Sequence, residues 1–67
     1  MNTGKLRGIM AEKGYSGRDM AQILEISEKT FYSKMKRGVF GTDEAEKMVS
    51  VLEIKDPAAI FFGNSVT

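Results

Sequence analysis

Residues 17–36 read GRDMAQILEISEKTFYSKMK, and the apolar residues of this stretch fall into two short helical patterns. They recur at intervals of three and four residues, first at Met20, Ile23 and Leu24 and then at Phe31 and Met35. This spacing puts each group on one face of an α-helix. Ser27 lies between the two groups. Because serine is a preferred N-cap, we expect one helix to end before Ser27 and the next to begin after it.

The short break at residues 25–27 is typical of a helix-turn-helix. Ala21 is small, as the crossing of two helices at about 90–120° requires. The apolar residues expected to fill the wedge between the helices are Leu24, Ile26 and Phe31. Ser27 would turn the amino end of the second helix outward. A helix presented in this way can enter the major groove of DNA, where all base pairs are distinguishable.

The outward face of the second helix carries residue types that can read DNA bases. At about 100° per residue, Lys29, Ser33 and Lys36 lie opposite the apolar residues of that helix. Lysine can donate to guanine, glutamate can accept from cytosine, and hydroxyl groups can bond bases or phosphates. The predicted base-reading residues are Glu28, Lys29, Tyr32 and Ser33.

Other groups are better placed for the DNA backbone. The helix that begins near Gly17 has free N–H groups at its amino end, which suit a phosphate. The predicted phosphate ligands are Gly17, Arg18, Lys34, Lys36 and Arg37. The alternative for residues 34–37 is a solvated helix end stabilised by the helix dipole. For Tyr32 the alternative is a surface residue without a role.

Capping residues predict further helices on both sides of this pair. Thr3 is a candidate N-cap for a first helix, and Gly14 can end that helix in the left-handed conformation. Ser16 with Asp19 three residues later forms a capping-box-like pair for the second helix. The apolar stripe expected on the first helix is Leu6, Ile9 and Met10.

Residues 42–61 also contain helix-capping residues and apolar residues at helical spacing. Thr42 is predicted to cap a fourth helix, and Asp56-Pro57 to begin a short fifth one. The apolar residues expected to pack there are Phe40, Ala45, Met48, Val49, Leu52 and Ile60. The sequence therefore predicts an all-α, compact five-helix domain over residues 1–67, with an ordered core at about 3–62 and a frayed tail at 63–67.

Composition excludes several classes of function. A chain of 67 residues has room for one small domain. It contains no cysteine and no histidine, which removes thiol chemistry, the usual general base and the commonest metal ligands. No apolar run approaches the roughly 20 residues that span a bilayer, and no signal-peptide pattern is visible. We expect a cytoplasmic protein that is not an enzyme and binds no metal, cofactor or small molecule.

The charge is divided unevenly along the chain. Residues 1–37 hold eight basic and four acidic residues, a net charge of +4, whereas residues 38–67 hold two basic and five acidic ones, a net charge of −3. One interpretation is a basic face for a polyanion with an acidic back. The other is a solvated surface with scattered charges.

The chain resembles the Cro/CI-type, lambda-repressor-like helix-turn-helix proteins of temperate phages and prophages, above all the short Cro-like regulators of Gram-positive prophages. The resemblance covers nearly all of residues 5–63. It is carried by Met20-Ala21, Ile26-Ser27, Lys29-Thr30-Phe31-Tyr32, Lys34-Met35-Lys36-Arg37-Gly38, Phe40, Met48, Leu52 and Ile60-Phe61-Phe62. It implies that Glu28, Lys29 and Ser33 read bases, and that the protein binds operator DNA as a dimer.

Three positions depart from the family pattern. Glu25 occupies a turn position that usually holds glycine. Because a left-handed glutamate costs about 1 kcal/mol or more, we expect a differently shaped turn. Gly17 replaces a glutamine that often holds a phosphate, and residues 35–37 replace an acidic residue near the end of the recognition helix.

The functional hypothesis is a sequence-specific transcriptional regulator, a repressor or Cro-like switch protein, bound to a pseudo-palindromic operator in double-stranded DNA. The alternative is a protein-interaction module or antirepressor on the same fold without DNA binding. Phe61 and Phe62 are adjacent rings on a very short helix, so one is expected in the core and the other as a candidate dimer contact. Pairing in solution and pairing only on DNA both remain open.

Overall fold

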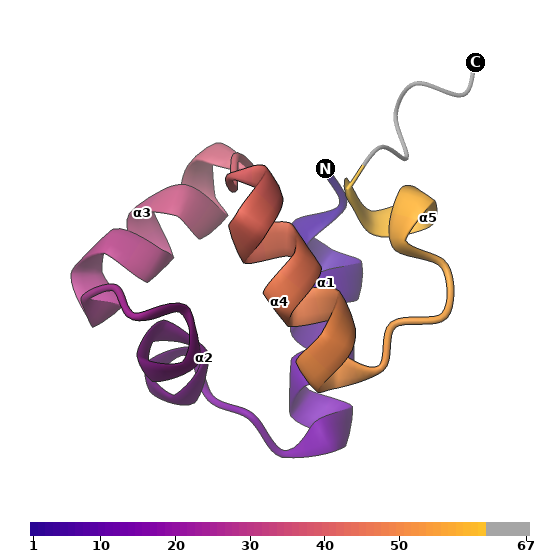
Figure 1. The fold of residues 1–67 in the computed structure, drawn as a ribbon, viewed down its shortest axis with the longest axis horizontal. Coiled ribbons are helices and arrows are strands. Elements are labelled where there is room, and N and C mark those ends of the chain that lie inside the picture. The colour runs from indigo at the N-terminus through magenta and orange to yellow at the C-terminus, as the bar shows by residue number, and fades with distance from the viewer. Residues whose placement is uncertain (62–67) are drawn as a thin grey trace.

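The computed structural model describes residues 1–61, and within them the chain forms five α-helices and no strand (Figure 1). The helices are α1 (Thr3–Lys13), α2 (Gly17–Leu24), α3 (Glu28–Arg37), α4 (Thr42–Leu52) and α5 (Pro57–Phe61). The prediction of an all-α chain is confirmed over this range. The predicted tail at residues 63–67 lies outside the described residues.

Local side-chain caps explain where most helices begin. Ser16 and Asp19 form the predicted capping box, with Asp19 N–H donating to Ser16 Oγ at 3.1 Å and Ser16 N–H to Asp19 Oδ2 at 2.9 Å. Ser27 Oγ accepts from Thr30 N–H at 3.0 Å and caps α3 as predicted. Asp56 precedes Pro57, the first residue of α5, also as predicted.

Two predicted caps are wrong by one residue. Asn2, not Thr3, caps α1, because the Asn2 side chain accepts a hydrogen bond from Lys5 N–H at 3.0 Å. Gly41, not Thr42, is the N-cap of α4. The Glu44 carboxylate accepts the Gly41 N–H at 2.8 Å, which leaves Thr42 as the first helical residue.

Four helices end in a left-handed residue, and two of these residues are not glycine. Gly14 and Gly38 end α1 and α3 with φ of 83° and 72°. Glu25 ends α2 with φ 60° and ψ 40°, and Glu53 ends α4 with φ 53°. The expectation of a differently shaped turn at Glu25 is therefore wrong. The glutamate adopts the conformation that glycine favours, and the turn is closed by Ile26 N–H donating to the Ala21 carbonyl at 3.0 Å.

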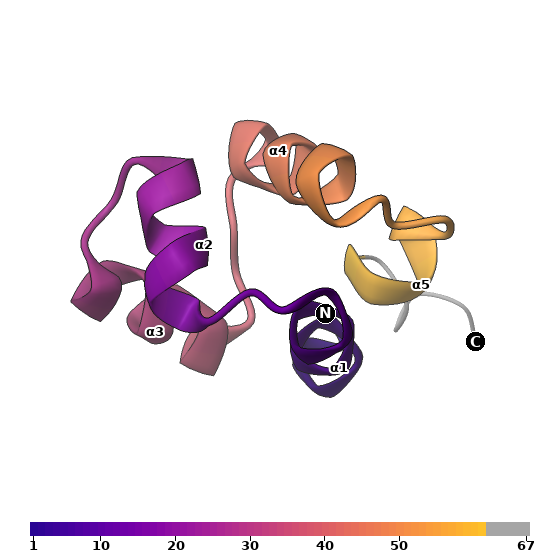
Figure 2. The ribbon, with the colours of Figure 1, turned by 90° about the horizontal axis from the view of Figure 1, so that it is seen from below.

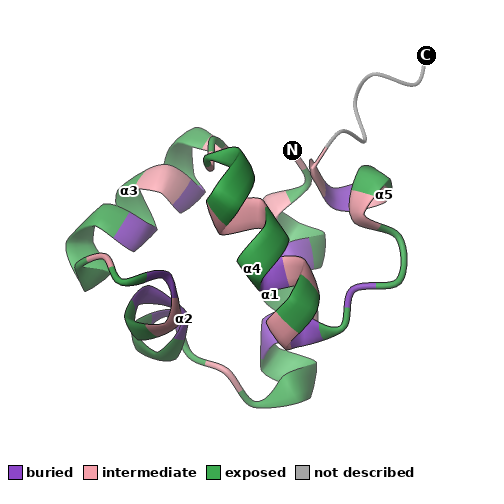
Figure 3. Ribbon diagram, viewed as in Figure 1, coloured by how far each residue is buried: buried purple, intermediate pink, exposed green. Residues whose placement is uncertain are grey.

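The buried apolar side chains form one core, and Figure 3 marks the buried residues on the ribbon. Its buried members are Leu6, Met10, Met20, Ala21, Leu24, Phe31, Met35, Met48, Leu52, Ile54 and Ile60. Phe40, predicted as a core residue, is half-buried and packs on the Phe31 ring with centroids 5.7 Å apart. Ala45 and Val49, predicted as part of a buried stripe, are only half-buried at the edge of this core.

Helices α2 and α3 lie at one end of the molecule, and α5 lies at the other (Figure 1). Helix α2 packs against α3 and α4, while α1 packs against α4 and α5. The view in Figure 2 shows α2 and α3 side by side. The amino terminus is fastened to α5 by a hydrogen bond of 2.7 Å from Asn2 N–H to the Ile60 carbonyl. The outward side of α3 is exposed to solvent.

Candidate nucleic-acid interface

Helix α3 divides sharply into a buried and an exposed face. Phe31 and Met35 are 0% and 2% exposed and fix the helix on the core. The remaining side is open to solvent (Figure 3). All four predicted base-reading residues, Glu28, Lys29, Tyr32 and Ser33, are exposed. Ser27 holds the first turn of α3, so Glu28 and Lys29 project from a capped helix end.

Tyr32 lies on the flank of α3 that faces the amino end of α2. Its ring packs edge-on against Phe31, with centroids 5.6 Å apart, and it is 48% exposed. Its hydroxyl and ring occupy the space that a Cβ at Gly17 would need. Gly17 itself is buried. The missing side chain at residue 17 thus makes room for Tyr32, a contact that spacing along either helix does not predict.

The amino end of α2 has two backbone amides without a hydrogen-bond partner in the described residues. Gly17 and Arg18 donate no hydrogen bond within residues 1–61, whereas Asp19 N–H is taken by Ser16. Hydrogen bonds from the Ser16 backbone and side chain lower the pKa of the Asp19 carboxyl, so it remains ionised beside the Arg18 cation. This end of α2 therefore has little net charge, and its attraction for a phosphate rests on the free amides.

Lys34 lies on the opposite flank of α3 and has a partner inside the protein. Its Nζ atom contacts Glu44 Oε1 at 2.8 Å and Glu44 Oε2 at 2.6 Å. The hydrogen bond from Lys34 lowers the pKa of the Glu44 carboxyl, against the opposing effect of burial. Of the predicted phosphate ligands, Lys34 is thus the one engaged with another side chain. The sequence contains both residues, but their pairing depends on how α3 and α4 pack.

The last turn of α3 presents two further cations. Lys36 and Arg37 are exposed and form no ion pair within residues 1–61. Lys29 is likewise exposed and unpaired over the same range. The turn before α3 does carry an ion pair. Its Glu25 Oε2 atom lies 3.4 Å from the Nζ atom of Lys47 in α4. Lys36 and Arg37 thus end the same helix whose exposed face carries the predicted base-reading residues.

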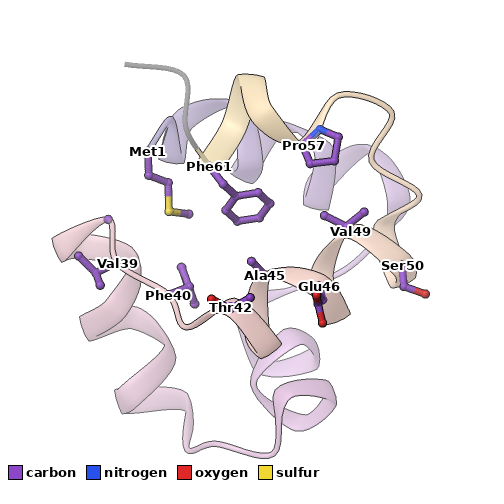
Figure 4. Close-up of a pocket in the computed structure, with 11 residues that line it drawn as sticks. Met1, Val39, Phe40, Thr42, Ala45, Glu46, Val49, Ser50, Pro57 and Phe61 are labelled. Carbon is purple, nitrogen blue, oxygen red and sulfur yellow. The ribbon is translucent and has the colours of Figure 1, made fainter. Parts of the chain in front are cut away.

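A second surface feature lies beyond the carboxyl end of α3. Phe61 is half-buried and lines an apolar groove of about 570 Å³ between α4, α5 and the loop after α3 (Figure 4). The side chains that line it include Met1, Val39, Phe40, Val49 and Pro57. Val39 is 63% exposed at its edge. Phe62, the other predicted dimer contact, lies outside the described residues.

The described residues contain no group of three acidic, histidine or cysteine side chains that could hold a metal ion. No helix among them is long and apolar enough to cross a bilayer. Comparison with protein-family models, curated proteins and solved structures finds no match to this chain.

Proposed function

We propose that this chain is a sequence-specific DNA-binding regulator of the Cro/CI type, in which α2 and α3 act as a helix-turn-helix within a lambda-repressor-like fold. In this proposal α3 is the recognition helix and enters the major groove. The observation that carries the proposal is the outward face of α3, which is polar, basic and uncovered. The opposite face of the same helix is anchored in the core by Phe31 and Met35.

The charge of this surface suits a polyanion. Residues 28–37 contain four bases and one acid. Because Glu44 neutralises Lys34, the charges left on the α3 surface are those of Glu28, Lys29, Lys36 and Arg37, a net charge of +2. An uncompensated basic face is the electrostatic signature of a nucleic-acid interface.

The proposed contacts follow from position along α3. Glu28, Lys29 and Ser33 lie on the exposed face and are assigned to base edges. Lys36 and Arg37 at the end of the helix are assigned to phosphates. The amino end of α2 adds the amides of Gly17 and Arg18. For Tyr32, packing against Gly17 favours a phosphate over a base.

Two copies of the chain are proposed to bind a pseudo-palindromic operator. Half-sites one helical turn apart would place the two recognition helices about 34–36 Å apart. Phe61 and its groove offer an apolar surface for contact between the copies. That groove also supports the alternative function, a protein-interaction module, because exposed apolar patches mark binding sites in small domains.

An NMR titration of ¹⁵N-labelled protein with a random-sequence duplex tests the proposal, at low and at moderate salt. We expect shifts concentrated at residues 17–32 and around Lys36, and we expect them to collapse with added salt because displaced counterions drive non-specific binding. If nothing moves at low salt, the DNA-binding proposal fails. The protein-interaction alternative would then be pursued by substitutions at Phe61.

A further inference from the structure

The ion pair between Lys34 and Glu44 is the best-formed polar contact on the surface of α3. Both carboxylate oxygens of Glu44 contact Lys34 Nζ, at 2.6 and 2.8 Å. The Glu44 side chain is 16% exposed and the Lys34 side chain 34% exposed. A third hydrogen bond, from Gly41 N–H to Glu44 Oε1 at 2.8 Å, holds the carboxylate in place.

The Glu44 carboxylate contacts Lys34 as a DNA phosphate group would. An anion with two oxygens lies within hydrogen-bond distance of the ammonium group, and the charge of the pair is zero. To bind a phosphate instead, Lys34 would have to leave Glu44. The carboxylate would then remain mostly buried without its cation, which is unfavourable.

The two neighbouring cations, Lys36 and Arg37, differ from Lys34 in having no carboxylate partner within residues 1–61. Lys36 and Arg37 belong to the same turn of α3 but are exposed and unpaired within residues 1–61. Glu44 therefore sets how many cations this end of α3 offers to a polyanion. Non-specific DNA binding is essentially electrostatic and grows with the number of neutralised phosphates, whereas base reading is not.

We infer that Glu44 limits the electrostatic part of DNA binding, because it acts as an internal substitute for a phosphate and withholds Lys34 from DNA. It lowers the affinity for all sequences about equally and leaves Glu28, Lys29 and Ser33 free to read bases. This inference rests on the proposed DNA-binding function.

The test is the salt dependence of binding to a random-sequence duplex, measured by fluorescence anisotropy between 50 and 200 mM salt. Glu44→Gln keeps an acceptor for Gly41 but removes the charge that holds Lys34. We expect the slope of log affinity against log salt to steepen by about 0.9, the value for one added phosphate contact. Lys34→Ala in the Glu44→Gln background should abolish this added slope.

Asp43→Asn is the matched control, because Asp43 is an exposed acid in the first turn of α4, as Glu44 is, without an ion pair in the described part of the chain. Its slope should equal that of the wild type. Equal steepening in both variants would reduce the effect to net charge and overturn the inference.

Lys34→Ala alone provides an independent measurement that does not depend on the folding of Glu44→Gln. It should leave the wild-type slope unchanged, since Lys34 makes no phosphate contact. A slope reduced by about 0.9 would show that Lys34 already binds a phosphate in the wild type. That result would overturn the inference about Glu44 but not the proposed function. A wild-type protein that binds no DNA at 50 mM salt would overturn the proposed function and this inference together.

Discussion

The two faces of α3 differ in exposure, although their residues are only one or two positions apart in the sequence. Phe31 and Met35 on the inward face are 0% and 2% exposed and join the core. Lys29, Ser33 and Lys36 on the outward face are all exposed. If α3 binds DNA as proposed, one helix carries a stabilising face and a binding face. Substitutions on the inward face should change the free energy of unfolding, and those on the outward face should change only binding.

Truncating the inward face should have the largest effect. Phe31→Ala removes a fully buried ring that packs against Phe40 and Tyr32. We expect a loss of roughly 3–5 kcal/mol in the free energy of unfolding, a large share of what a small domain has. Urea unfolding followed by circular dichroism measures it. Ser33→Ala on the outward face is the control and should stay within about 0.5 kcal/mol of the wild type. Equal midpoints for the two variants would contradict the division of α3 into two faces.

Lys29→Ala should affect recognition and leave stability unchanged. If Lys29 reads a base, its loss should reduce discrimination between operator and random DNA by about 1–3 kcal/mol. The measurement compares affinity for a duplex selected from random DNA with affinity for its scrambled form. An equal loss on both duplexes would remove Lys29 from the base-reading residues and leave it as a phosphate ligand.

Lys36→Ala should have a smaller and sequence-independent effect. Removing a phosphate contact weakens binding to all sequences about equally and reduces the salt slope by about one. Lys55→Ala is the matched control, because Lys55 is an exposed lysine between α4 and α5, outside the α3 surface. The same reduction for both variants would mean that overall charge, and not the end of α3, governs binding.

The features that the sequence predicts correctly are those with a local cause. Ser16 and Ser27 each cap a helix through an amide three residues ahead, so the signal and its structure lie within one turn. The hydrogen bonds at the two wrongly predicted caps are equally local: Lys5 N–H donates to Asn2 Oδ1, and Gly41 N–H donates to Glu44 Oε1. The inward face of α3 was likewise readable from the four-residue spacing of Phe31 and Met35.

The features that the sequence does not predict depend on packing between helices. Lys34 and Glu44 are ten residues apart and meet only because α3 and α4 come together. Tyr32 and Gly17 are on different helices, and the absence of a side chain at residue 17 says nothing about which ring fills the space. Glu25 was predicted to reshape the turn because its intrinsic preference is unfavourable. The hydrogen bond that closes the turn and the packing of both helices outweigh that preference.

The smallest effect is expected at the turn, which belongs to neither face of α3. Glu25 is left-handed at φ 60°, a conformation that costs a residue with a side chain roughly 1–2 kcal/mol. Glu25→Gly removes this strain but increases the entropy of the unfolded chain, so we expect a net gain of about 0.5 kcal/mol in the free energy of unfolding. The lost ion pair with Lys47 subtracts little, because the Glu25 side chain is 81% exposed.

Glu53→Gly is the matched variant, since Glu53 ends α4 in the same conformation and its exposed side chain lies 3.8 Å from Lys13. Both variants should be stabilised to a similar extent in urea unfolding, and both should bind operator and random DNA as the wild type does. If Glu25→Gly alone lost discrimination between sequences, the glutamate would contribute to how the turn aims α3. The turn would then contribute to binding as the outward face does. A substitution at residue 25 would change both the free energy of unfolding and the discrimination between DNA sequences.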